Sequence, residues 1–149
     1  MTIDEFNVLM KMPKAFSDLP VCPPVTGTNT ILEVTSLTTS DQFNVDIDRR
    51  SSFTLSKCKL QNRTVIKNIP LVRIDIDSPP HMNPDGSKTS RNHIHIYNTA
   101  DGDTGKLSWA YSLESFDGIS YQPGSKFMDI FLEFCRYCNI KATEIQGVL

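Results

Sequence analysis

The feature that most constrains the fold is a series of segments in which apolar and polar residues alternate. In residues 42–50, for example, Phe43, Val45 and Ile47 alternate with polar side chains. Strands of the same character are expected at residues 30–37, 53–63, 69–77, 91–97 and 106–113. Alternation with a period of two is typical of a strand that buries one face. Because the connections between these segments are short, we expect the sheet to be mainly antiparallel.

Two amphipathic helices are expected to flank the strands. In residues 2–12 apolar side chains fall at helical spacing, and Thr2 followed by Glu5 is a typical helix start. Residues 125–139 carry a second apolar stripe, with Ser125 as the candidate N-cap. The proline-rich segment after the first helix is expected to be a surface connection. The predicted fold class is therefore α+β, with a mostly antiparallel curved sheet of about six strands and both terminal helices packed on one face.

Length and composition narrow the class of protein. The 149 residues fit a single domain, 1–149, and 39% apolar residues suffice for a packed core. The sequence has neither a long apolar run nor a basic secretory leader, so we expect a soluble cytoplasmic protein without disulfides. Cys135 and Cys138 lie in the second helix and are interpreted as buried apolar side chains rather than as a redox or zinc pair.

The net charge of −2 is unevenly distributed along the chain. Between Asp46 and Lys106 we count ten basic and seven acidic residues, which leaves five basic and ten acidic residues elsewhere. This imbalance is too weak for a strongly basic nucleic-acid-binding protein. It permits a basic groove on an otherwise acidic surface.

All three histidines fall within residues 81–97. His93 and His95 are two residues apart in one expected strand, so their side chains leave it on the same side. Arg73 and Asp75 have the same relation one strand earlier. If these strands pair as a hairpin, the candidate site residues lie on one face of the sheet, and His81, in the connecting loop, lies at the rim of that face. The candidate site residues are Arg73, Asp75, His81, His93, His95 and Tyr97.

Two chemistries would use such a set. Three imidazoles on one side of an ion can bind Zn²⁺ or another divalent metal with an open position for water, and Asp75 or Asp85 could complete the shell. Without a metal, one imidazole could deprotonate a ribose hydroxyl and another protonate the leaving oxygen. In that case Arg73 would stabilise the phosphorane, and Tyr97 or a lysine would position it.

Plainer interpretations compete with both chemistries. The exposed face of an antiparallel sheet is normally polar, and His, Arg and Asp pairs across strands are ordinary there. Histidines bonded to backbone carbonyls beneath a helix would instead be core residues. Asp101–Gly105 resembles the start of a calcium loop, but Ser112 occupies the position of the bidentate acid, so an acidic turn is expected. Asn83–Gly86 predicts another turn.

The second half of the chain resembles a known family. The pattern LVRIDID, HMNPDG, HIHIY, WAY and a closing helix ending in CNI is similar to short uncharacterised proteins of Gram-positive bacteria, their prophages and other mobile elements. The similarity covers roughly residues 71–140, and the insertion NTADGDTGK after Tyr97 departs from the pattern. Because that family has no established activity, the resemblance implies a genomic setting and not a reaction.

We therefore expect a phage or mobile-element accessory protein that acts by stoichiometric binding. Its partner would be a host or element-encoded protein, and its role that of an inhibitor of a host defence system or a regulator. The alternative is a toxin-type ribonuclease or metal-dependent phosphodiesterase that uses His81, His93, His95 and Arg73, with RNA as its substrate. The sequence does not decide whether the protein is an enzyme. We expect no cofactor apart from that metal, and no membrane partner.

Overall fold

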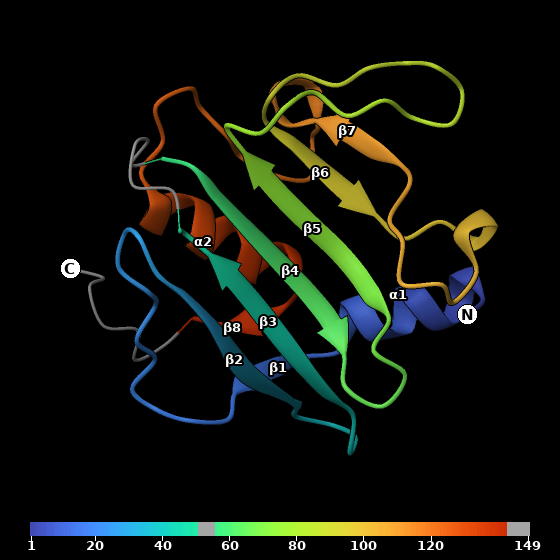
Figure 1. The fold of residues 1–149 in the computed structure, drawn as a ribbon. Coiled ribbons are helices and arrows are strands. Elements are labelled where there is room, and N and C mark those ends of the chain that lie inside the picture. Colours follow the sequence, from blue (N-terminus) through green and yellow to red (C-terminus); the bar gives the residue numbers. More distant parts are fainter. Residues whose placement is uncertain (51–55, 143–149) are drawn as a thin grey trace.

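The computed structural model describes residues 1–50 and 56–142 (Figure 1). Along the chain its elements are α1 (Ile3–Lys11), β1 (Lys14–Phe16), β2 (Asn29–Ser36), β3 (Gln42–Asp48), β4 (Cys58–Thr64), β5 (Pro70–Ile76), β6 (His93–Ile96), η1 (Thr99–Asp101), β7 (Ala110–Ser112), η2 (Leu113–Ser115), α2 (Phe127–Tyr137) and β8 (Ile140–Lys141).

The described strands form one open sheet in the order β7-β6-β5-β4-β3-β2-β1-β8. Neighbouring strands are antiparallel, with the exception of β1 and β8, which are parallel. Both helices lie on the same side of this sheet, behind the strands in Figure 1. The predicted α+β class with a mostly antiparallel sheet is confirmed. The predicted number of about six strands is wrong, because the sheet has eight.

The two strands that the sequence did not predict are the shortest ones at one edge of the sheet. β1 has three residues and β8 has two, too few to show an alternating pattern. β1 is held between its neighbours, with Phe16 opposite Val34 of β2 and Lys14 opposite Ile140 of β8. The expectation of a surface connection after α1 is therefore wrong for its first three residues.

At the opposite edge the expected strand 106–113 is shorter than predicted. The strand β7 comprises only Ala110–Ser112, and its central residue, Tyr111, is 44% exposed. The other predicted strands agree with the sheet to within a few residues, except that 51–55, the segment before β4, lies outside the described residues.

The two helices begin differently. The Thr2 hydroxyl accepts a hydrogen bond from the backbone N–H of Glu5 at 3.1 Å, which confirms Thr2 as the N-cap of α1. Ser125, however, is not the N-cap of α2. Its hydroxyl donates to the Gln122 carbonyl instead, and α2 begins at Phe127.

The core lies between the sheet and the two helices. It joins alternate side chains of the central strands to the phenylalanines of α2, and among its fully buried members are Val45, Leu60, Ile74, Ile94, Phe131 and Phe134. Ile96 is half-buried and packs against this core. Cys135 and Cys138 are buried, as the sequence predicts. Neither helix has the length and apolar character needed to cross a membrane, and the described residues contain no other candidate span.

Candidate functional site: a buried aspartate–histidine cluster

The pairing of β5 with β6 brings four of the predicted site residues together. Arg73 lies opposite His95 and Asp75 lies opposite His93 in antiparallel register. Their side chains leave the sheet on the side away from Ile74 and Ile94, which face the core. The predicted common face for these residues is confirmed. We call Arg73, Asp75, His93 and His95 the histidine cluster.

The loop between β5 and β6 is fixed to the edge of the sheet beyond β7. The Asn83 side chain accepts a hydrogen bond from the Ala110 N–H at 2.8 Å and donates to the Ala110 carbonyl at 3.0 Å, as a neighbouring strand would. The predicted turn at Asn83–Gly86 is confirmed by a hydrogen bond from the Gly86 N–H to the Asn83 carbonyl. Gly86 has φ +87°, a conformation that favours glycine.

The histidine cluster is therefore covered. His93 and His95 are 1% and 2% exposed and Asp75 is 4% exposed, whereas the Arg73 side chain is 31% exposed. The interpretation of these residues as a solvated sheet face is wrong. The covering groups belong to loops and not to a helix, so the arrangement also differs from a core histidine beneath a helix.

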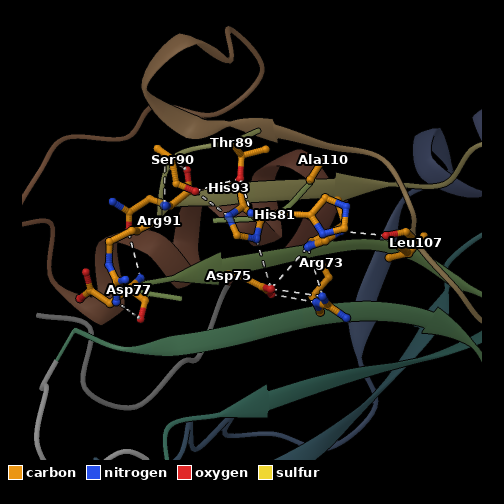
Figure 2. A network of polar contacts seen from close by, with 12 residues as sticks. Arg73, Asp75, Asp77, His81, Thr89, Ser90, Arg91, His93, Leu107 and Ala110 are labelled. Atoms are coloured by element: carbon orange, nitrogen blue, oxygen red, sulfur yellow. Dashed lines mark hydrogen bonds and ion pairs between the residues drawn. The ribbon is translucent and has the colours of Figure 1, made fainter. Parts of the chain in front are cut away.

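Within the cluster each imidazole contacts a different group with each of its two nitrogens (Figure 2). Nδ1 of His93 is 3.0 Å from the Ser90 carbonyl, and Nδ1 of His95 is 2.9 Å from the Leu107 carbonyl. Nε2 of each ring lies 3.4 Å from the same oxygen, Oδ2 of Asp75. Both rings are thus held by backbone carbonyls on one side and point at one carboxylate oxygen on the other.

Arg73 is the link between the cluster and solvent. Its Nε donates to Oδ1 of Asp75 at 2.8 Å and its Nη2 to Oδ2 at 3.1 Å. The same Nη2 is 3.1 Å from Nε2 of His95. The guanidinium therefore neutralises the carboxylate and offers a hydrogen bond to one of the two imidazoles.

His81 lies beside the cluster, and its ring is half-buried. The ring centroid is 4.6 Å from that of His95 and 6.1 Å from that of His93, and Nε2 is 2.7 Å from the Ser108 carbonyl. The three rings do pack together, as predicted. The group whose ligand atoms converge, however, is Asp75, His93 and His95, with these atoms within 4.8 Å of one another.

The tyrosine and one of the acids named from the sequence, Tyr97 and Asp85, lie elsewhere. The Tyr97 ring stacks on Phe6 of α1, and its hydroxyl donates to the Met1 carbonyl at 2.9 Å, so it does not converge with the histidines. Asp85 accepts hydrogen bonds from Ser87 in the exposed turn and does not join the predicted metal shell. Asp46 is paired with Arg63 of β4.

Electrostatics make the cluster a charged carboxylate beside a neutral imidazole. Burial by itself raises the pKa of Asp75, but hydrogen bonds from His93, His95 and Arg73 outweigh it and hold the pKa well below its ordinary range. Burial lowers the pKa of His95, and the neighbouring carboxylate only partly opposes this change. At neutral pH the cluster therefore contains a strong anionic acceptor and at least one uncharged ring.

Sequence reasoning missed the groups that orient the imidazoles. They are backbone carbonyls of Ser90, Leu107 and Ser108, which carry no side-chain signal. Asn83, which anchors the covering loop, was visible only as part of a turn motif.

These observations define an α+β protein with two helices on one face of an open sheet and a buried aspartate–histidine cluster on the other. The chain belongs to a family of unknown function, DUF6978, whose model matches residues 1–140. Neither the curated proteins nor the solved structures contain a significant match to the chain. Membership of an uncharacterised family is thereby confirmed.

Proposed function

We propose that this protein acts by stoichiometric binding to another protein through a groove beside α1. The groove has a volume of about 470 Å³ and lies between α1 and the turn that joins β4 to β5. It is lined by Met1, Asp4, Glu5, Val8, Leu9, Met12, Asp41, Thr64, Ile66, Lys67 and Ile69. This groove is the observation that carries the proposal.

The walls of the groove expose apolar side chains. Val8 on one side is 60% exposed and Ile66 on the other is 86% exposed. Adjacent exposed apolar groups of this size favour contact with a partner, because burying them removes apolar surface from water. The groove is lined by the acids Asp4, Glu5 and Asp41, by the base Lys67 and by Met1, whose N-terminal ammonium is paired with Asp103. The partner surface that fits is an apolar segment with basic neighbours.

The genomic setting suggested by the resemblance of residues 71–140 supplies the kind of partner. We propose a host protein or a protein encoded by the same mobile element, with inhibition of a host defence system or regulation as the outcome. An acidic lining suits an inhibitor that covers a basic surface, since opposite charges speed association and favour the correct orientation.

Burial of the histidine cluster supports binding over catalysis. A phosphodiester must come within hydrogen-bond distance of a general acid and base, but His93 and His95 are almost fully covered. One observation supports the alternative function of a toxin-type ribonuclease or metal-dependent phosphodiesterase. The Arg73 guanidinium reaches solvent beside the two imidazoles, and a phosphate bound there would lie next to them.

The test compares exposed substitutions that do and do not fall in the groove. Tagged wild-type protein and its Val8→Glu, Ile66→Glu and Ile31→Glu variants are produced in cells of the source. Ile31 is the matched control, because it is 57% exposed and lies on β2, away from the groove residues. We expect a partner that copurifies with the wild type and Ile31→Glu but not with the groove variants, and a complex of fixed stoichiometry from purified components.

Two results would contradict the proposal. One is equal recovery of the partner with the groove variants. The other is cleavage of RNA by the purified wild type that is lost in a His93→Gln, His95→Gln double variant, since removing a general acid or base costs about 10²–10⁴-fold in rate. That second outcome would establish the enzyme instead.

A further inference from the structure

In their neutral forms the two imidazoles of the histidine cluster have more acceptors around them than N–H groups. A neutral imidazole carries one N–H, and carbonyl and ionised carboxylate oxygens can only accept. His93 faces the Ser90 carbonyl with one nitrogen and Asp75 with the other, and His95 faces the Leu107 carbonyl and Asp75. In its neutral form each ring therefore presents a lone pair to an acceptor.

The carbonyl contacts indicate which nitrogens carry the protons. Nδ1 lies closer to its carbonyl, at 3.0 Å in His93 and 2.9 Å in His95, than Nε2 lies to the carboxylate, at 3.4 Å in both. With the proton on Nδ1, the form in which an imidazole can bind a metal, both Nε2 lone pairs point at Oδ2 of Asp75. With a proton on Nε2 each ring would instead donate to Oδ2, which is how the two rings hold the pKa of Asp75 down. Arg73 offers a donor to Nε2 of His95. Among the described residues, Nε2 of His93 has the carboxylate as its contact and no donor.

We propose that Asp75, His93 and His95 bind one divalent transition-metal ion, Zn²⁺ being the ion that fits best, through Oδ2 and the two Nε2 atoms. A cation at the point where these three atoms converge replaces lone-pair repulsion with three coordinate bonds. Imidazole nitrogen with carboxylate oxygen is a ligand set for zinc and similar metals, whereas Mg²⁺ and Ca²⁺ prefer oxygen ligands alone.

The distances fit this ion. Two ligand atoms at about 2.0–2.2 Å from a tetrahedral ion are about 3.3–3.6 Å apart. The two separations between Oδ2 of Asp75 and the imidazole Nε2 atoms are both 3.4 Å, so these ligands already stand at a tetrahedral spacing. All three ligand atoms lie within 4.8 Å of one another.

The groups around the ligands are those that orient metal sites. Metal-bound histidines usually donate their other N–H to a carbonyl or carboxylate, which fixes the ring, and Ser90 and Leu107 supply such carbonyls. Arg73 Nε holds Oδ1 of Asp75, while its Nη2 contacts both Oδ2 of Asp75 and Nε2 of His95. The ion would displace Nη2 from both atoms, and the guanidinium, 31% exposed, has solvent to turn into.

His81 is outside the proposed ligand set. Its Nε2 is engaged with the Ser108 carbonyl, and its ring packs against His95. Three protein ligands leave one tetrahedral position for water. The metal site shares no residue with the groove beside α1, so either proposal can fail while the other holds.

The test is titration of chelator-treated, dialysed protein with Zn²⁺, followed by calorimetry and thermal melting. We expect one Zn²⁺ per chain and a melting temperature that rises with Zn²⁺ concentration, because a ligand that binds only the folded state stabilises it. Mg²⁺ should have no such effect. No binding of Zn²⁺ by the wild type, or an equal response to Mg²⁺, would overturn the proposal.

Matched variants assign the ligands. Asp75→Asn and His93→Gln should each weaken Zn²⁺ binding by at least about a hundredfold, since loss of a mere orienting group already costs about 10–100-fold. Asp46→Asn makes the same change on another strand, at a carboxylate paired with Arg63, and His81→Gln removes the histidine outside the ligand set. Both controls should bind Zn²⁺ as the wild type does. Equal losses in a control and a ligand variant would contradict the assignment.

A measurement on the wild type alone covers the case in which a variant does not fold. Nitrogen NMR of the imidazole rings should show Zn²⁺ shifting the Nε2 resonances of His93 and His95 while their Nδ1 atoms remain protonated. Shifts confined to His81, or none in the two cluster histidines, would refute the site.

Discussion

Lys14 and Asp75 are both charged and both buried, but they differ in how well the hydrogen-bond donors and acceptors around them are matched. The Lys14 ammonium donates to the carbonyls of Met10, Met12 and Cys138 at 3.2, 3.1 and 2.7 Å. These carbonyls lie at the C-terminal ends of α1 and α2, where helices leave acceptors without partners. Three N–H groups meet three carbonyls, and the Phe43 ring lies 5.1 Å from the ammonium.

The surroundings of Asp75 contain more hydrogen-bond acceptors than donors. Its carboxylate and two backbone carbonyls are acceptors, and each of the two imidazoles supplies one N–H in its neutral form. Arg73 supplies part of the difference. The comparison shows how to separate two kinds of buried charge. The chain itself supplies a hydrogen-bond partner for every donor of Lys14, whereas a surplus of converging acceptors, as around Asp75, indicates a position for a cation.

The largest effect that tests this comparison is expected for Lys14→Met. The substitution keeps the approximate length of the side chain but leaves three buried carbonyls without donors. We expect the free energy of unfolding to fall by about 3–5 kcal/mol, measured by urea denaturation. Loss of the link between the helix ends should also expose Cys138, whose thiol is fully buried in the wild type.

Thiol labelling provides the check on that mechanism. Burial raises the pKa of Cys138 to about 12, so its thiol is protonated and unreactive at neutral pH. Labelling of Cys138 should be faster in Lys14→Met than in the wild type. Unchanged labelling together with unchanged stability would show that Lys14 does not join the two helix ends.

A smaller effect is expected from the titration of Lys14. Burial lowers its pKa from 10.5 to about 8. Between these values the unfolded chain binds a proton that the folded chain has lost, so this group makes the free energy of unfolding rise with pH. The stability difference between the wild type and Lys14→Met should therefore grow between pH 8 and pH 9, by at most about 1.4 kcal/mol.

The test uses the stability difference between the wild type and Lys14→Met, because titration of the buried cysteines makes the free energy of unfolding fall with pH. Burial raises the pKa of Cys58 from 9.0 to about 12, so the folded chain keeps a proton that the unfolded chain loses. Both proteins contain Cys58, and its contribution cancels. The contribution of Cys138 does not cancel once Lys14→Met exposes its thiol, so the comparison is made below pH 9, where an exposed thiol still keeps its proton. A difference that stays constant or shrinks over this range would mean that burial does not lower the pKa of Lys14.

The smallest effect is expected for Asp75→Asn in metal-free protein. An amide at this position brings two N–H donors into a site that has too few, facing the Nε2 atoms of His93 and His95. Arg73 loses its carboxylate but is partly exposed and can be hydrated. We expect a loss of no more than about 1 kcal/mol in urea denaturation with chelator present. A loss as large as that of Lys14→Met would show that the two buried charges contribute equally to the free energy of unfolding.

The sequence by itself determined the strands that carry the candidate site and the common face of Arg73, Asp75, His93 and His95. It could do so because side chains alternate along a strand whatever the strand pairs with. The N-cap at Thr2 and the turn at Asn83–Gly86 were predictable for a similar reason, since each is set by neighbours within a few residues.

Only the tertiary structure decided that the cluster is buried, that Tyr97 turns away to Met1, and that the imidazoles are oriented as they are. The tertiary structure also decided that β1 and β8 form, and that Lys14 lies between the helix ends. All depend on backbone groups that are distant in sequence, such as the Leu107 carbonyl for His95 and the Cys138 carbonyl for Lys14. Every residue has a carbonyl, so the sequence does not mark which of them folding will bring to a given side chain.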